Sequence, residues 1–281
     1  MSLAIYRFTL AEVVGRKVVT WGLVASAIFL ALFAVAFRLL YREIVGQSLA
    51  DDVQQALVGG VLTVLGLYVT SFLAAFLAMS LAAGSVSADA DSGVLQAIVV
   101  RPLRRWQWYL GRWAGFSTLI VAYVALMTGA MLLIAWSFSG YRPLSITALI
   151  GLMSLQVVFL LTVGMLISCR LSTLATGVVL FFYFGIAWLS GFIGFIGQMA
   201  QQAALTQTAT AVSLVAPSDA LWKAASHFAA PRGVPLGTIA DNVEMPFMSL
   251  REPSALFLAW TLVLTVIVLA SGVRAFGRRD L

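Results

Sequence analysis

The sequence predicts an all-α membrane protein with six transmembrane helices, and its composition, charge spacing and charge asymmetry all support this. Of the 281 residues, 62% are hydrophobic and 10% are charged, whereas an ordinary soluble domain is roughly half apolar and a quarter charged. So few charged side chains cannot cover a soluble fold of this length with a polar surface. The composition therefore excludes a soluble globular protein and indicates a chain embedded in lipid.

The uncharged stretches define six spans. A helix that crosses the bilayer needs about 20 apolar residues, and six stretches between charged residues are long enough. The stretch after Arg170 is long enough for two spans, but its second half is rich in Gln and Thr and therefore too polar for a helix that faces lipid. The predicted spans are Val18–Phe37, Leu57–Ala83, Ala114–Phe138, Ile146–Cys169, Leu174–Ile196 and Ser254–Val273.

Charge asymmetry predicts the orientation. If both termini are cytoplasmic, the inner segments carry a net charge of +7 and the outer segments −1, which accounts for the total of +6. An excess of Arg and Lys on the cytoplasmic side is typical of membrane proteins. We therefore expect the N- and C-termini in the cytoplasm of a multi-pass protein. The net basic charge is explained by this topology, so we expect no nucleic-acid partner.

The segment before the first span predicts an amphipathic helix at the membrane surface, over residues 1–17. Leu3, Tyr6 and Leu10 share one face of this helix, and Glu12 and Arg16 form an i,i+4 pair on the other. A cleaved signal peptide is the alternative, since Ala34-Val35-Ala36 resembles a cleavage site. The uncharged run of 20 residues is longer than the usual apolar region of a signal peptide, so we expect the first span to be retained.

The predicted spans contain no Asp, Glu, Lys, Arg or His. Pumps driven by protons or ions keep such groups in the membrane, so the energy for any transport cycle is expected from a separate subunit, although a passive structural role fits equally. A single histidine, His227, and a single cysteine, Cys169, indicate no metal or redox site.

Small residues predict close helix packing, within one subunit or in a dimer. They are Ala74, Ala78 and Ala82; Gly111 and Gly115; and Gly191, Gly194 and Gly197, which could instead break the fifth span.

The longest cytoplasmic segment, residues 84–113, predicts two short helices. Ser92 can cap the first, which ends by Arg101 because Pro102 follows. Pro102 can start the second, whose cations and aromatic rings are typical of the membrane interface. They are Arg104, Arg105, Trp106, Trp108 and Tyr109. From these residues alone, the segment could equally anchor the chain at the membrane or dock a cytoplasmic partner.

A motif in this segment resembles a known family. The run Asp91-Ser92-Gly93-Val94-Leu95, then Arg101-Pro102-Leu103-Arg104-Arg105 and Gly111-Arg112, is similar to the signature of permease subunits of type-2 ATP-binding-cassette (ABC) transporters. The six spans, the surface helix, Pro217-Ser218-Asp219 and the basic C-terminal tail extend the resemblance over most of the chain. Asp91, Val94 and Arg112 stand where glutamate, threonine and lysine are more usual.

The resemblance implies that this chain catalyses no reaction itself. It implies that Asp91, Gly93, Leu95, Pro102 and Arg105 belong to a coupling helix segment that contacts a separate cytoplasmic ABC ATPase. No G-x-x-x-x-G-K-[ST] phosphate loop occurs in the sequence, so ATP and Mg²⁺ are expected on the ATPase. We expect no catalytic, cofactor-binding or metal-binding residue in this chain.

The expected assembly is a permease homodimer with two ATPase copies in a prokaryotic cytoplasmic membrane, acting as an exporter. Two alternatives remain. The first is an ATP-driven relay of motion to an extracytoplasmic protein, as in permeases of metalloenzyme maturation systems. The second is a membrane scaffold or channel that needs no ATP.

The segment 197–253 is expected to be a structured external loop. Ser218 and Asp219 can cap a helix over Ala220–Phe228, followed by loop residues rich in Pro and Gly. This loop could gate an exit, meet an extracytoplasmic partner or simply cover the bundle. Taken together, residues 1–281 are expected to form a single transmembrane permease domain.

Overall fold

The computed structural model describes residues 2–15, 17–46, 52–86, 104–232, 246–249 and 251–278. Within these residues the protein is all-α, and the only β-type pairing is an isolated bridge between Pro143 and Pro231. The fold class predicted from the sequence is therefore confirmed.

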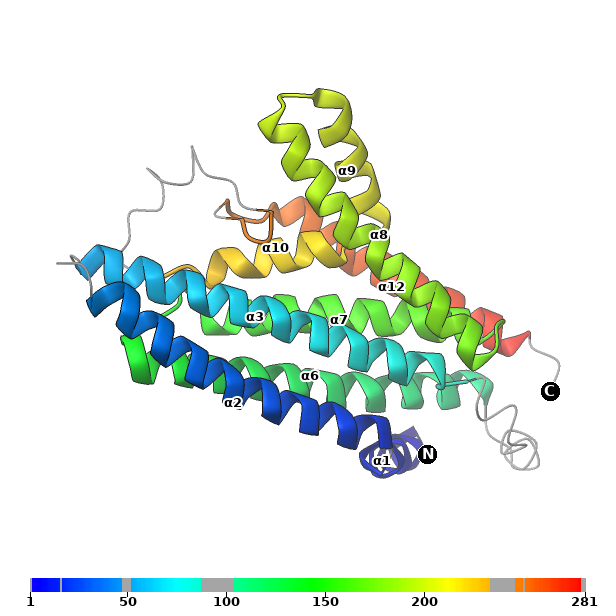
Figure 1. Ribbon diagram of the computed structural model, residues 1–281. Coiled ribbons are helices and arrows are strands. Elements are labelled where there is room, and N and C mark those ends of the chain that lie inside the picture. The colour runs from blue at the N-terminus through cyan, green and yellow to red at the C-terminus, as the bar shows by residue number, and fades with distance from the viewer. Residues whose placement is uncertain are drawn as a thin grey trace.

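In the part of the chain that the structure describes, six helices are long and apolar enough to cross a membrane. Neighbours in the chain run in opposite directions, so that both termini lie at one end of the bundle (Figure 1). We call this the terminal end and the opposite one the far end. The six helices are α2 (Lys17–Gly46), α3 (Asp52–Ala83), α6 (Arg105–Ser139), α7 (Ile146–Ser168), α8 (Thr173–Met199) and α12 (Ala255–Gly277).

The start of α6 differs from the prediction. Arg105, Trp106, Trp108 and Tyr109 were expected in a separate helix at the membrane interface, but they form the first turns of α6 itself. Trp108 and Tyr109 are buried, because their rings pack against Phe276 of α12. The prediction that these residues are helical is confirmed, but a helix separate from the span and an interfacial place for Trp108 and Tyr109 are wrong, because another helix of the same chain covers these two rings.

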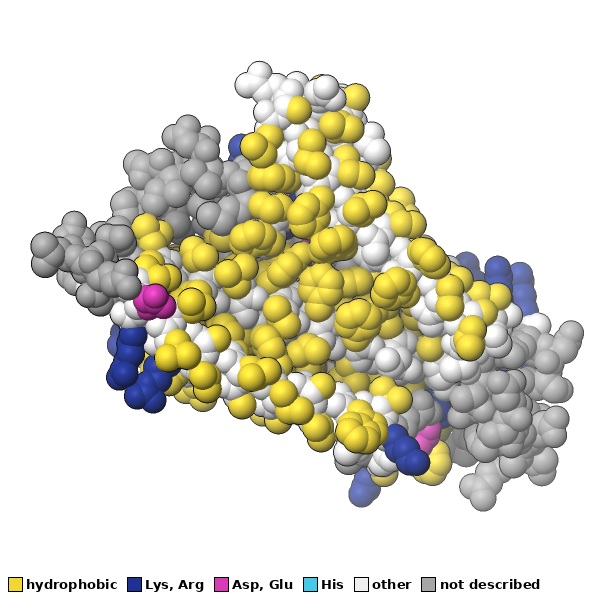
Figure 2. Space-filling model, in the orientation of Figure 1, with side chains coloured by type: hydrophobic (Ala, Val, Ile, Leu, Met, Phe, Trp, Pro, Cys, Tyr) yellow, Lys and Arg dark blue, Asp and Glu magenta, His cyan; other side chains and the backbone are white. Residues whose placement is uncertain are grey.

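The core lies around α7, which packs against α3, α6, α10 and α12. The share of buried residues in the most apolar part of a helix is 61% for α7, but only 11% for α2 and 17% for α12. The peripheral helices are apolar on their exposed surfaces. Figure 2 shows hydrophobic side chains spread over the middle of one face, with Lys and Arg near the two ends of the bundle. Such a surface suits a lipid environment.

Small residues bring these helices together within the subunit. A Cβ atom added to Gly164 of α7 would lie 2.5 Å from the Cβ of Ala82 in α3, and one on Gly115 of α6 would lie 2.9 Å from Thr9. Thr9 belongs to α1 (Ser2–Val14), the helix predicted before the first span. The predicted small-residue contacts of Ala82 and Gly115 therefore occur inside one chain.

The chain after α8 turns back along the bundle. Helix α9 (Ala203–Val215) forms a hairpin with α8, and α10 (Ser218–Phe228) then lies beside α7 (Figure 1). The Tyr183 hydroxyl donates to the carbonyl of Val215 at 2.6 Å. Tyr183 lies ten residues into α8, about 15 Å along that helix at 1.5 Å per residue. The hairpin thus returns the chain to the mid-length of the bundle before α10 begins.

Helix α10 then leads back to the far end, where Ser145, just before α7, donates its backbone N–H to the carbonyl of Phe228 at 3.2 Å. The helix predicted over 220–228 is confirmed, and it begins two residues earlier, at Ser218. The glycines of α8 do not break that helix, which continues to Met199. Two of them instead face the hairpin: Gly194 lies against Ala209 and Gly197 against Leu205.

Candidate functional site

Of the five residues that the motif assigns to the coupling segment, Asp91, Gly93, Leu95 and Pro102 lie outside the described residues. Arg105 is the first residue of α6 and is exposed. Its Nη1 donates to the carbonyl of Gly277 at 3.1 Å, at the C-terminal end of α12. A cation is favourable there because the last carbonyls of a helix carry partial negative charge. Arg105 thus joins the end of the coupling segment to the last span.

Two turns into α6, Arg112 is almost fully buried. Its Nη2 lies 3.2 Å from Oε1 of Glu12 in α1, and its Cζ lies 5.1 Å from the centre of the Trp108 ring and 5.4 Å from that of Phe116. The ion pair and the two ring faces together compensate the buried guanidinium. The sequence pattern placed Glu12 in a local pair with Arg16 and did not reveal this contact, because its partners are 100 positions apart.

The end of α3 that leads into the coupling segment is also tied to a neighbour. The backbone N–H of Val86 donates to Oγ of Ser168 at 3.2 Å, and this hydroxyl donates to the carbonyl of Ala83 at 3.2 Å. Ser168 is the last residue of α7. We call the contacts of Arg105, Arg112, Trp108 and Ser168 the terminal network. It connects both flanks of residues 87–103 to α1, α7 and α12.

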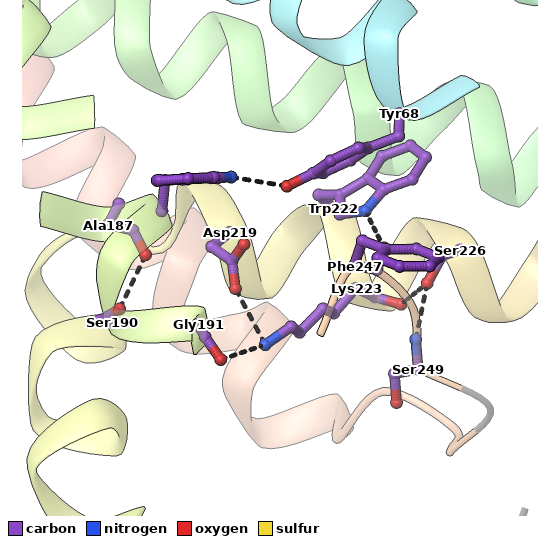
Figure 3. Close-up of polar contacts among 11 residues, drawn as sticks. Tyr68, Ala187, Ser190, Gly191, Asp219, Trp222, Lys223, Ser226, Phe247 and Ser249 are labelled. Atoms are coloured by element: carbon purple, nitrogen blue, oxygen red, sulfur yellow. Dashed lines mark hydrogen bonds and ion pairs between the residues drawn. The ribbon is translucent and has the colours of Figure 1, made fainter. Parts of the chain in front are cut away.

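A second polar cluster lies at the mid-length of the bundle, around the first turn of α10 (Figure 3). Oδ2 of Asp219 lies 3.1 Å from Nζ of Lys223, which also donates to the carbonyl of Gly191 in α8 at 3.1 Å. Gly191 has no room for a Cβ atom, because the carboxyl group of Asp219 occupies that space. The predicted glycine pattern in α8 therefore makes room for an acidic side chain.

Aromatic hydrogen bonds surround this α10 cluster. Trp188 of α8 donates to the hydroxyl of Tyr68 in α3 at 2.6 Å, and Trp222 donates to the carbonyl of Phe247 at 2.6 Å (Figure 3). Ser226 accepts the backbone N–H of Ser249 at 3.0 Å. The cluster therefore joins α3, α8, α10 and the segment before α12.

A cavity of about 10 Å³ lies inside the cluster, bordered by Asp219, Tyr68 and Gln156 of α7. Oε1 of Gln156 is buried and has no hydrogen-bond partner among the described residues. A space of this size is near the minimum that holds one water molecule. Burial raises the pKa of Asp219 to about 6, and the ammonium of Lys223 opposes this rise. The arrangement is a buried, nearly neutralised polar contact that fixes α10 in the bundle.

Sequence reasoning treated Asp219 only as a cap of α10, whereas the N-cap residue is Pro217. The i,i+4 spacing of Asp219 and Lys223 was the available signal of an ion pair. Among the described residues there is no group of three His, Cys, Asp or Glu side chains that could hold a metal. Cys169 is buried and its thiol donates to the carbonyl of Met165, so it packs inside the bundle.

The comparison with known families agrees with this architecture. The family model described as "ABC-2 family transporter protein" matches residues 16–281. No curated protein matches the chain. Because the family model covers nearly the whole sequence and the structure has six apolar spans, the chain belongs to the ABC-2 transporter family and is a membrane permease subunit of an ABC transporter, a component that works with a partner ATPase.

Proposed function

We propose that this permease is a homodimeric exporter subunit in a prokaryotic cytoplasmic membrane, driven from the terminal end by two copies of an ABC ATPase. ATP and Mg²⁺ are bound by the ATPase, and both termini of the permease face it. The observation that carries this proposal is the terminal network. Both flanks of the coupling segment are bonded to other helices, so a force on this segment reaches most of the bundle.

The mechanical path can be followed residue by residue. A displacement after Val86 acts on α7 through Ser168, and a displacement before Arg105 acts on α12 through Gly277. Arg112 passes the motion of α6 to α1 through Glu12. ATP-driven closure of the ATPase dimer would then tilt several spans together and change access to a pathway between two permease copies.

The test uses the full permease purified together with its ATPase. Asp91→Arg combined with Leu95→Asp should abolish copurification of the ATPase and reduce vanadate-sensitive hydrolysis at least tenfold. Glu43→Arg is the control for Asp91→Arg, because Glu43 is an exposed acidic residue near the far end of α2. If the double variant kept full copurification and hydrolysis, the assignment of the coupling segment would be wrong. Full transport by the permease without any ATPase would favour a channel or scaffold.

The relay to an extracytoplasmic protein has one observation in its favour. Helix α9 has no buried residue, and the hairpin of α8 and α9 projects from the side of the bundle (Figure 1). The turn of this hairpin carries the polar residues Gln198, Gln201 and Gln202. A relay predicts that Gln201→Arg uncouples an extracytoplasmic partner while ATPase copurification and substrate export remain normal; an exporter predicts no such partner-dependent effect.

A further inference from the structure

An open groove of about 730 Å³ lies at the far end of the bundle, between α6 and α7. Arg142 and Arg232 border its mouth, and Gly129, Leu133, Trp136 and Ile146 line its apolar part. It shares no lining residue with the terminal network or with the α10 cluster. The mechanical path proposed above uses none of its residues.

The backbone holds the two arginines together. The N–H of Arg232 donates to the carbonyl of Arg142 at 3.0 Å, and the adjacent Pro143 and Pro231 form an antiparallel bridge. A further bond of 3.0 Å joins Leu144 to Ala230. Both arginines are exposed, and neither makes an ion pair with a described carboxylate. Like charges placed side by side in this way repel each other unless an anion lies between them.

Below the arginines, the wall of the groove is apolar and open to the outside. Leu133 is 65% exposed, Trp136 55% and Ile146 49%. Gly129 lies ten residues before the end of α6, so this wall extends about 15 Å into the span at 1.5 Å per residue. Exposed apolar side chains on a membrane span face acyl chains, and a tryptophan is typical of the headgroup level. Ser145 and Thr147 also line the groove and add hydroxyl groups to it.

We propose that this groove binds an anionic glycerophospholipid from the leaflet at the far end. The phosphate lies between Arg142 and Arg232, since guanidinium groups recognise phosphate oxygens in a bidentate manner. Ser145 and Thr147 meet the glycerol region, and one acyl chain follows Leu133 towards Gly129. Charge complementarity selects the anionic headgroup, as in other basic pockets between membrane helices.

The headgroup part is tested by native mass spectrometry of the purified permease with equimolar phosphatidylglycerol and phosphatidylethanolamine of the same chain length. The wild type should retain phosphatidylglycerol at least fivefold more than phosphatidylethanolamine. Arg142→Gln with Arg232→Gln should remove this preference. Arg38→Gln with Arg42→Gln is the matched control, because these exposed arginines lie near the far end of α2 and do not border the groove; its preference should change less than twofold.

The acyl part is tested by filling the groove. No atom lies within 4 Å of a Cβ added to Gly129 or to Gly151 of α7, so either position accepts a side chain without a clash at its first atom. Gly129 lines the groove and Gly151 does not. Gly129→Leu should weaken binding of long-chain phosphatidylglycerol at least threefold and leave a six-carbon-chain analogue unaffected, whereas Gly151→Leu should alter neither. This variant keeps the test informative if the double arginine variant is too unstable to purify.

Several outcomes would overturn the proposal. Equal retention of both lipids by the wild type, or an equal loss in the two double arginine variants, would show that the groove does not select the headgroup. Displacement of the lipid by millimolar inorganic phosphate would show a site for free anions. Loss of a permease dimer in the Arg142→Gln, Arg232→Gln variant, with lipid retention unchanged, would show that a second copy covers the groove.

Discussion

The terminal network and the α10 cluster each contain an ion pair between described residues, and the two pairs differ in which partner is buried. In the terminal network the cation is buried: the side chain of Arg112 is 4% exposed and that of Glu12 is 27% exposed. In the α10 cluster the anion is the more buried partner, since Asp219 is 10% exposed and Lys223 is 24% exposed.

This difference has a chemical consequence. A guanidinium keeps its charge at any accessible pH, so the buried Arg112 needs permanent compensation, which Glu12 and two aromatic rings supply. A buried carboxylate can instead take up a proton. The raised pKa of Asp219 shows that the α10 cluster already lies close to that limit. The permease thus accommodates buried charge in two ways. At the terminal end a permanent ion pair neutralises Arg112, whereas at mid-length Asp219 can take up a proton.

The largest effect is expected from breaking the α10 cluster at Gly191. Gly191→Ala places a methyl group where the carboxyl of Asp219 lies, so the carboxyl must leave Lys223. We expect a loss of about 3–5 kcal/mol, measured as a lower midpoint of thermal unfolding in detergent. Gly185→Ala is the control in the same helix, since no atom lies within 4 Å of its added Cβ; it should not destabilise. Equal midpoints for the two variants would contradict the proposed contact.

The next largest effect is expected in the terminal network, where separate variants of Glu12 and Arg112 show which charge of the ion pair matters more for stability. Glu12→Gln removes the negative charge beside the buried cation and should cost about 2–4 kcal/mol. Arg112→Met keeps the apolar packing and leaves a partly exposed carboxylate, so it should cost about half as much. The double variant should resemble Arg112→Met. Unfolding midpoints of the three variants provide the measurement, and a larger loss for Arg112→Met than for Glu12→Gln would mean that the cation is not the critical buried charge.

A pH series sharpens the comparison. Lys223→Met removes the cation that lowers the pKa of Asp219, so this pKa should rise further above about 6. A carboxyl group whose pKa is raised by folding stabilises the fold at low pH. This contribution to the free energy of unfolding is lost as the pH rises through the pKa of the folded state. The cost of Lys223→Met relative to the wild type should therefore grow between pH 6 and pH 8. Gly185→Ala changes no ionisable group, so its difference from the wild type should not vary over this range. Parallel pH profiles of Lys223→Met and the wild type in thermal unfolding would disprove this effect of Lys223.

The smallest effect is expected at Arg105. Its hydrogen bond to Gly277 is exposed, and exposed charged contacts contribute about 1 kcal/mol or less. Arg105→Ala should therefore change the unfolding midpoint only slightly. If Arg105 transmits force, the same variant should still lower ATPase stimulation by the permease in the complex. A loss of stability as large as that of Glu12→Gln would show that Arg105 holds the fold rather than the coupling path.

Several features of the fold could be predicted because they depend on local composition. The uncharged stretches gave six spans, and all six are helices. The polar residues after Met199 correctly excluded a seventh span in that stretch, and a helix was expected and found at Ser218–Phe228. The start of α6 was not predicted, because the aromatic rings of Trp108 and Tyr109 would suit either a membrane interface or a protein core.

The sequence by itself determined that this protein lies in a membrane, how many times it crosses, and which segment resembles the contact with an ATPase. These properties follow from the free energy of placing each stretch of chain in lipid, which is a sum over neighbouring residues. Only the tertiary structure decided that Glu12 meets Arg112, that Gly191 makes room for Asp219, and that Arg142 lies beside Arg232. Such contacts join positions far apart in the chain, and they depend on how the helices pack rather than on the composition of any one of them.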